Sequence, residues 1–296
     1  MRELEYIKYI TRRFRVKKPV VKGIGDDCAI IDYTKDKYLL LTTDMIIEGT
    51  HFSNRAKPFQ IGWKAMACSI SDIASMGGAP RYAVVSAGIP RKKSGRYLKE
   101  VTKGIEKICK EFNVTVVGGD TNSSDKVVLS VTLIGEVDKK KVTRRSGAKP
   151  GDLIFVTGAI GEGKRKHLTF VPRAKEARVL VDNFKVRSMI DLSDGLAMDL
   201  NRLTKASRVG ARVYKSLLPL SEHSEPLDRA ICSGEDFELL FTISLKEARR
   251  MIMRMGRRDD LPITLIGEIV DRRFGVKLIE ESGKAKTLKP KGFEHL

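Results

Sequence analysis

The stretch DKKKVTRRSGAKPGD, residues 138–152, divides this 296-residue chain into two halves. It is basic and rich in turn-forming residues, and the pattern of apolar segments starts again directly after it. Upstream, residues 37–44 predict a strand and residues 59–78 a helix that ends at two glycines. Downstream, the same mixture of predicted strands and helices returns. The sequence therefore predicts an α+β fold of two domains, residues 1–140 and 141–296.

Composition and charge restrict the class of protein. The net charge of +19 invites a nucleic-acid partner, but the lysines and arginines are spread along the chain without an aromatic ladder, which argues against specific nucleic-acid binding. No run of about 18 apolar residues is present, so we expect a cytoplasmic protein without membrane contact. The four cysteines are scattered without disulfide or zinc spacing.

The segment VTGAIGEGKRKH, residues 156–167, comes close to a phosphate-binding P-loop. Gly158, Gly163 and Lys164 fit the motif, but Arg165 stands where the motif requires the Ser or Thr that binds magnesium. Because arginine cannot replace that hydroxyl, we interpret the segment as a glycine loop after a strand, and we expect phosphate to be handled elsewhere.

Carboxylates gather where predicted strands meet loops. Any one of them is explained equally well as a turn or a helix cap, but five such motifs together favour a site. They contain Asp26, Asp27, Asp44, Asp120, Asp191, Asp194, Glu235 and Asp236.

Asp72 lies near the end of a predicted helix, where the helix dipole disfavours a carboxylate by up to about 1 kcal/mol, so a positive group is expected from outside that helix. Carboxylates and threonine hydroxyls without paired Cys or His select magnesium, which shares its ligands with water and substrate phosphates.

In this order the motifs resemble the thiamine-monophosphate kinase family, which belongs to the ATP-binding superfamily that includes aminoimidazole ribonucleotide synthetase. The segments that carry the resemblance are GIGDDCAII, TTDMIIEGTHF, KAMACSISDIASMGGAP, VVGGDT, TRRSGAKPGD, MIDLSDGL, SGEDFELLFT and KGFEHL. The resemblance implies two domains per subunit and N-terminal domains that pair in a homodimer. It also implies magnesium-dependent transfer of phosphate from ATP to thiamine monophosphate.

The resemblance also implies roles for individual residues. The implied metal ligands are Asp27, Thr42, Thr43, Asp44, Asp72, Asp120, Asp191 and Asp194. The implied nucleotide contacts are Gly119, Arg145 and Ser193, and the implied contacts to the thiamine moiety are His51, Glu235 and Phe293.

The sequence departs from the family pattern at two places, and two alternative functions stay open. The segment after Gly161 is shorter than in many relatives, and Thr102 stands where relatives often have an aromatic residue near the nucleotide. Another enzyme of the superfamily, such as aminoimidazole ribonucleotide synthetase, remains the closest rival. A basic nucleic-acid-binding protein on a kinase-like scaffold is the alternative from a different class.

Overall fold

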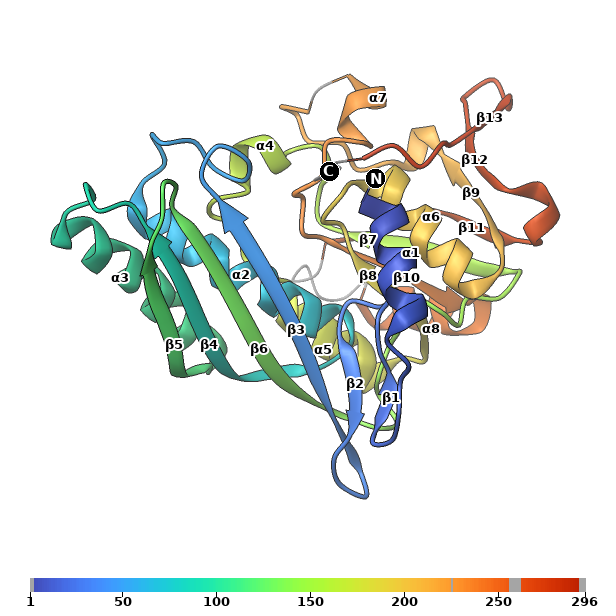
Figure 1. Ribbon diagram of the computed structural model, residues 1–296. Coiled ribbons are helices and arrows are strands. Elements are labelled where there is room, and N and C mark those ends of the chain that lie inside the picture. Colours follow the sequence, from blue (N-terminus) through green and yellow to red (C-terminus); the bar gives the residue numbers. More distant parts are fainter. Residues whose placement is uncertain (1–2, 225, 256–261, 293–296) are drawn as a thin grey trace.

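The computed structural model describes residues 3–224, 226–255 and 262–292 (Figure 1). The first half of the chain forms a six-stranded sheet in the order β1-β2-β3-β6-β4-β5. Neighbouring strands pair antiparallel except β4 and β5, which run parallel. The strands are β1 (Val20–Lys22), β2 (Ala29–Asp32), β3 (Lys37–Ile47), β4 (Ala79–Ile89), β5 (Thr115–Ser123) and β6 (Val128–Asp138).

Helices cover one face of this sheet. The helices of this half are α1 (Glu3–Arg13), α2 (Pro58–Ser75) and α3 (Gly95–Phe112). Helix α2 contacts β3, β4 and β6, and α3 packs against α2 (Figure 1). Proline suits the first turn of α2 because its missing N–H is not needed there. The other face of the sheet carries apolar side chains that are exposed to solvent, among them Met45, Tyr82 and Val84.

The second half of the chain forms a seven-stranded sheet in the order β13-β12-β9-β11-β7-β10-β8. Only β12 and β9 pair in parallel among its described strands. The strands are β7 (Asp152–Thr157), β8 (Val186–Asp191), β9 (Gly210–Tyr214), β10 (Leu239–Ser244), β11 (Ile263–Val270), β12 (Val276–Ile279) and β13 (Ala285–Thr287). The helices are α4 (Gly163–Lys166), α5 (Ala174–Asn183), α6 (Leu196–Ser207), α7 (Leu227–Ala230) and α8 (Leu245–Met255), with 3-10 turns at Lys215–Leu217 and Arg272–Phe274.

Helix α2 joins the two halves. It contacts α5 and β8 of the second half, and its Ala74 lies in one hydrophobic cluster with Phe155 and Phe241. The predicted α+β class with two domains is confirmed. The domain boundary between residues 140 and 141 stays a prediction. The strands of the first sheet end before this boundary, and those of the second sheet begin after it. Among the described residues, no helix combines the length and the apolar character needed to cross a bilayer.

Candidate active site

A cleft of about 800 Å³ lies where α2, β3 and the loops of both halves meet. Its walls include residues from α1, from the loop after β1, from β3 and from α6. Most of the predicted site residues line it: Asp27, Thr42, Thr43, Asp44, His51, Asp72, Arg145, Ser193, Asp194 and Glu235. The structure therefore brings together residues that are up to about two hundred positions apart in the sequence.

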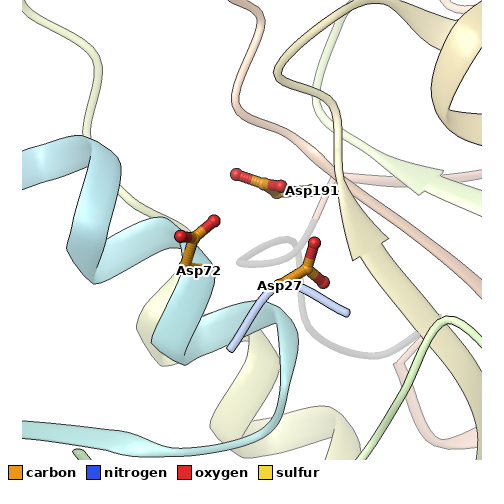
Figure 2. A group of neighbouring side chains, drawn as sticks. All are labelled: Asp27, Asp72 and Asp191. Carbon is orange, nitrogen blue, oxygen red and sulfur yellow. The ribbon is translucent and has the colours of Figure 1, made fainter. Parts of the chain in front are cut away.

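Three carboxylates converge beside this cleft (Figure 2). Asp27 lies in the loop between β1 and β2, Asp72 in the last turn of α2, and Asp191 at the end of β8. One oxygen of each lies within 4.8 Å of an oxygen of the other two. Three hard oxygen donors at this spacing suit a magnesium ion that keeps waters or phosphate oxygens as its remaining ligands.

Hydroxyl groups fix the orientation of these carboxylates. Ser75 and Ser71 of α2 donate to Asp27 and Asp191 at 2.7 and 2.6 Å. Thr42 of β3 donates to the Asp72 carboxylate at 2.5 Å. Each of these carboxylates keeps a second oxygen for other partners.

Ser69, also on α2, donates to the Asp44 carboxylate of β3 at 2.9 Å. The α2 serines were not among the predicted site residues. A signal was present, since SISDIAS places polar side chains along one side of an otherwise apolar helix.

The electrostatics of the cluster favour binding of a cation. Burial raises the pKa of the Asp72 carboxyl well above its ordinary value, and the charges of Asp44, Asp191 and Asp27 raise it further. Burial and the nearby Asp27 charge raise the pKa of Asp191 in the same way. Several carboxylates approach one another here, and a bound cation would offset their charge. Such a cation would be the positive group that the position of Asp72 in its helix predicts.

Arg145 contacts this cluster directly through Asp27. Its Nε and a terminal nitrogen both donate to one oxygen of Asp27, at 3.0 and 2.6 Å. Burial opposes the charge, but Asp27 and Asp26 raise the pKa of Arg145, so its guanidinium stays charged. Arg145 thus lies at the cleft as predicted, with part of its donor capacity engaged by a carboxylate rather than free for phosphate.

The turn before α6 holds Ser193 and Asp194. The Ser193 carbonyl accepts the backbone N–H of Glu235 at 2.7 Å. Asp194 forms an ion pair with Arg202, which also contacts Asp199 at 2.8 Å. Burial raises the pKa of Asp199 to about 7, and the neighbouring Asp194 charge adds to this effect. This turn therefore connects the cleft to the loop that carries Glu235.

Four predicted residues are not part of the cleft lining, and one of them, Asp191, lies beside the cleft with Asp27 and Asp72. Gly119 and Asp120 lie on the exposed edge strand β5, outside the cleft as the described residues form it. The Asp120 carboxylate accepts from the Thr121 N–H at 2.9 Å and from the Asn122 amide at 2.7 Å. Phe293 lies outside the described residues. Strand order separates Asp120 from Asp44, because β6 and β4 lie between β3 and β5.

The loop that resembles a P-loop binds an anion supplied by the protein itself. The backbone N–H groups of Gly161 and Gly163 donate to the Asp236 carboxylate at 3.0 and 2.9 Å, and that of Glu162 donates to it at 3.1 Å. Successive backbone N–H groups form this kind of concave anion site, which is here filled by a side chain. A Cβ at Gly163 would meet the Gly234 carbonyl at 2.0 Å, so glycine permits the two loops to approach this closely. The interpretation of this segment as a loop after a strand is correct for residues 158–162, which follow β7, but residues 163–166 form the short helix α4.

Family models match both halves of the chain. The model for the AIR synthase related protein, N-terminal domain, matches residues 25–137, and the model for the corresponding C-terminal domain matches residues 149–279. Together with the two α+β halves and the acidic cleft, these matches define a two-domain protein of the AIR synthase related class.

Similar proteins show to which family within this class the chain belongs. The chain is 33% identical over 325 residues to the thiamine-monophosphate kinase of Bacillus subtilis (strain 168), covering 100% of this chain and 99% of the relative. It is 34% identical over 312 residues to that of Rhodopirellula baltica, covering 99% and 97%. A solved structure, AaThiL complexed with AMPPCP and TMP, superimposes with a TM-score of 0.84 at 29% identity and covers 100% of this chain and 97% of that one. The chain belongs to the thiamine-monophosphate kinase family.

Proposed function

We propose that this protein transfers the terminal phosphoryl group of ATP to the phosphate of thiamine monophosphate and forms thiamine diphosphate and ADP. The family membership and the similarity to a chain solved with AMPPCP and TMP support this reaction. The observation that carries the proposal furthest is the cluster of Asp27, Asp72 and Asp191 beside a cleft large enough for two substrates.

The residues of this cluster fit one Mg²⁺ ion, and the further carboxylates that line the cleft would hold additional ions. The oxygen donors are hard, they lie within 4.8 Å of one another, and burial raises the pKa values of Asp72 and Asp191. Asp27, Asp72 and Asp191 would hold one such ion, and Asp44 and Asp194 face the same cleft. Bound Mg²⁺ screens the repulsion between two polyanionic substrates and aligns their phosphates. Arg145, fixed by Asp27, adds a permanent positive charge at the cleft.

The chemistry requires no nucleophile from the protein. The acceptor oxygen belongs to a phosphate monoester whose second pKa is about 6, so it is already anionic near neutral pH. This oxygen bonds to the terminal phosphorus of ATP while the bond from that phosphorus to the bridging oxygen breaks and ADP leaves. We therefore expect direct in-line transfer. Trapping of radiolabelled phosphate on the protein after incubation with labelled ATP would refute it.

The reaction is tested with purified protein, magnesium-ATP and thiamine monophosphate, with thiamine diphosphate followed by mass spectrometry. We expect magnesium-dependent product with the wild type and its loss in Asp44→Asn, whose side chain lines the cleft. Asp125→Asn, at an exposed turn, changes the net charge equally and should keep activity. If the wild type binds ATP but forms no thiamine diphosphate, the proposal fails, and the substrate of aminoimidazole ribonucleotide synthetase is tested next.

We propose also that two chains pair through their N-terminal sheets. The face of this sheet opposite α2 exposes Met45, Tyr82 and Val84, and β5 is an exposed edge strand that carries Gly119 and Asp120. Such an apolar face is typical of a protein interface. Sedimentation analysis should show a dimer that dissociates in Tyr82→Lys, and a monomeric wild type would refute the pairing.

A further inference from the structure

Lys64 on α2 is the buried cation of the cleft. Only 1% of its surface is exposed, and it lies in the most apolar helix of the N-terminal half. Burying an ammonium group is costly unless each of its three donors finds an acceptor. The Nζ atom of Lys64 has three acceptors: the His51 carbonyl at 3.0 Å, His167 Nδ1 at 2.7 Å, and the Glu235 carboxylate.

These three acceptors come from separate parts of the chain. His51 lies in the turn after β3, His167 follows α4, and Glu235 lies in the loop before β10. His51, Lys64 and Glu235 all line the cleft. Lys64 therefore fastens one wall from the first half to two loops of the second half.

His167 completes this arrangement as a neutral acceptor. Burial and the positive charge of Lys64 lower its pKa, and the charge of Glu235, whose carboxylate lies 3.1 Å from Nδ1, opposes this effect. Because a lysine ammonium group can only donate, we assign Nδ1 as the acceptor and the ring proton to Nε2. His167 therefore contacts both members of the Lys64 and Glu235 pair.

The loop that carries Glu235 has a strained backbone, which contacts to other segments must hold in place. Gly234, Glu235 and Phe237 have φ values of +67°, +60° and +51°, a region in which non-glycine residues are strained. Asp236 anchors the loop in the backbone site at residues 161–163. The Phe237 ring stacks on a second phenylalanine, with ring centroids 3.9 Å apart. The contact to Lys64 sets where the Glu235 carboxylate lies.

Distance along α2 separates this group from the acidic cluster. Lys64 precedes Asp72 by eight residues, which is about 12 Å at 1.5 Å per residue. One end of the cleft thus offers carboxylates for metal-bound phosphates. The other end offers a carboxylate and a histidine that are held by a buried ammonium group, which suits the organic end of a phosphate ester.

We propose that Lys64 is a positioning residue for recognition of the organic end of the acceptor, acting through Glu235 and the His51 turn, with His167 as the third acceptor. This inference rests on the proposed function. The three donors of Lys64 are taken by His51, His167 and Glu235, which leaves none for a phosphate, so its loss should weaken acceptor binding and leave nucleotide binding unchanged.

The test compares wild type with Lys64→Met by steady-state kinetics. We expect the KM for thiamine monophosphate to rise at least tenfold while the KM for ATP changes less than twofold. Lys110→Met, on the solvent face of α3, removes the same charge and should change neither value. Similar changes in both KM values, or an unchanged KM for thiamine monophosphate, would overturn the inference.

A double-mutant cycle separates positioning from folding. Lys64→Met combined with Glu235→Gln removes both charges of the buried pair at similar volume, so the double variant should fold even if Lys64→Met does not. If Lys64 acts through Glu235, the double variant binds thiamine monophosphate as weakly as Glu235→Gln alone. Additive losses would refute the coupling.

Calorimetric titration with thiamine monophosphate in the absence of ATP distinguishes a failure of the proposed kinase reaction from a failure of the proposed role of Lys64. A wild type that binds this compound without phosphorylating it refutes the kinase reaction, and the binding constants of the variants then decide the role of Lys64. A wild type that neither binds nor phosphorylates it refutes both.

Discussion

Replacing Asp72 by asparagine should stabilise the metal-free protein. The substitution removes one negative charge from three carboxylates whose oxygens lie within 4.8 Å of one another. The asparagine oxygen can still accept the Thr42 hydroxyl, so the hydrogen bond at this position is kept. The change therefore acts mainly on the repulsion within the cluster.

The magnitude follows from the geometry. Two unit charges 4.8 Å apart repel by about 3.5 kcal/mol at an effective dielectric constant of 20. Burial and the neighbouring carboxylates raise the pKa values of Asp72 and Asp191, so protonation relieves part of this repulsion in the wild type. We expect a gain of about 2 kcal/mol in the free energy of unfolding, which corresponds to a Tm increase of about 3 °C for a chain of 296 residues.

With Mg²⁺ present, the wild type should be more stable than Asp72→Asn. At a concentration 100-fold above Kd, a bound ligand adds about 2.7 kcal/mol to the stability of the wild type, and Asp72→Asn should lose most of that gain. Differential scanning calorimetry with EDTA and with Mg²⁺ measures both effects, with Asp125→Asn as a charge-matched control. A variant that is less stable than wild type in EDTA and keeps the full Mg²⁺ response would refute the reasoning.

Three further predictions concern other parts of the molecule. Gly119→Ala should lower the free energy of unfolding by about 2 kcal/mol or more, because its Cβ would lie 2.0 Å from a carbonyl oxygen of β4; Gly118→Ala, whose Cβ has 3.8 Å of clearance, should cost far less in the same denaturant titration. Arg145→Lys loses the paired N–H contacts to Asp27 and should raise the KM for ATP about tenfold, whereas an unchanged KM would exclude a nucleotide role. Burial raises the pKa of Asp236 from 3.8 to about 6, so the folded state binds more protons than the unfolded state between these values. The resulting stabilisation, up to about 3 kcal/mol, is complete below pH 3.8 and is lost as pH rises through 6; the stability of wild type relative to Asp236→Asn should therefore fall across this window, and a rise would contradict the assignment.

The sequence predicted the parts of this fold that depend on local patterns. Residues 37–44 fall within β3, and the helix predicted at residues 59–78 is α2, which ends at Ser75 because the next turn leads into Gly77 with φ +73°. Carboxylates at the ends of strands could be identified because their sequence neighbours are turn residues. Asp72 could be identified because its position in a helix was unfavourable.

The parts that escaped prediction depend on contacts between distant segments. The sequence of α2 shows Lys64 in an apolar helix, but no local rule reveals that its partners are His51, His167 and Glu235. The exclusion of Asp120 from the cleft of a single chain likewise follows from strand order, which places two strands between it and Asp44. Spacing along the chain does not contain this information.

The segment that resembles a P-loop keeps the backbone N–H groups of an anion site, but it binds a carboxylate of the protein instead of a phosphate. The backbone N–H groups of residues 161–163 point at an anion, as they would in a phosphate site, but the anion is the carboxylate of Asp236. That carboxylate belongs to the same loop as Glu235, and its burial in the backbone site restricts the strained backbone around it. Because phosphate would have to displace a covalently attached competitor, we interpret this glycine loop as a support for the segment that carries Glu235 and not as a phosphate site.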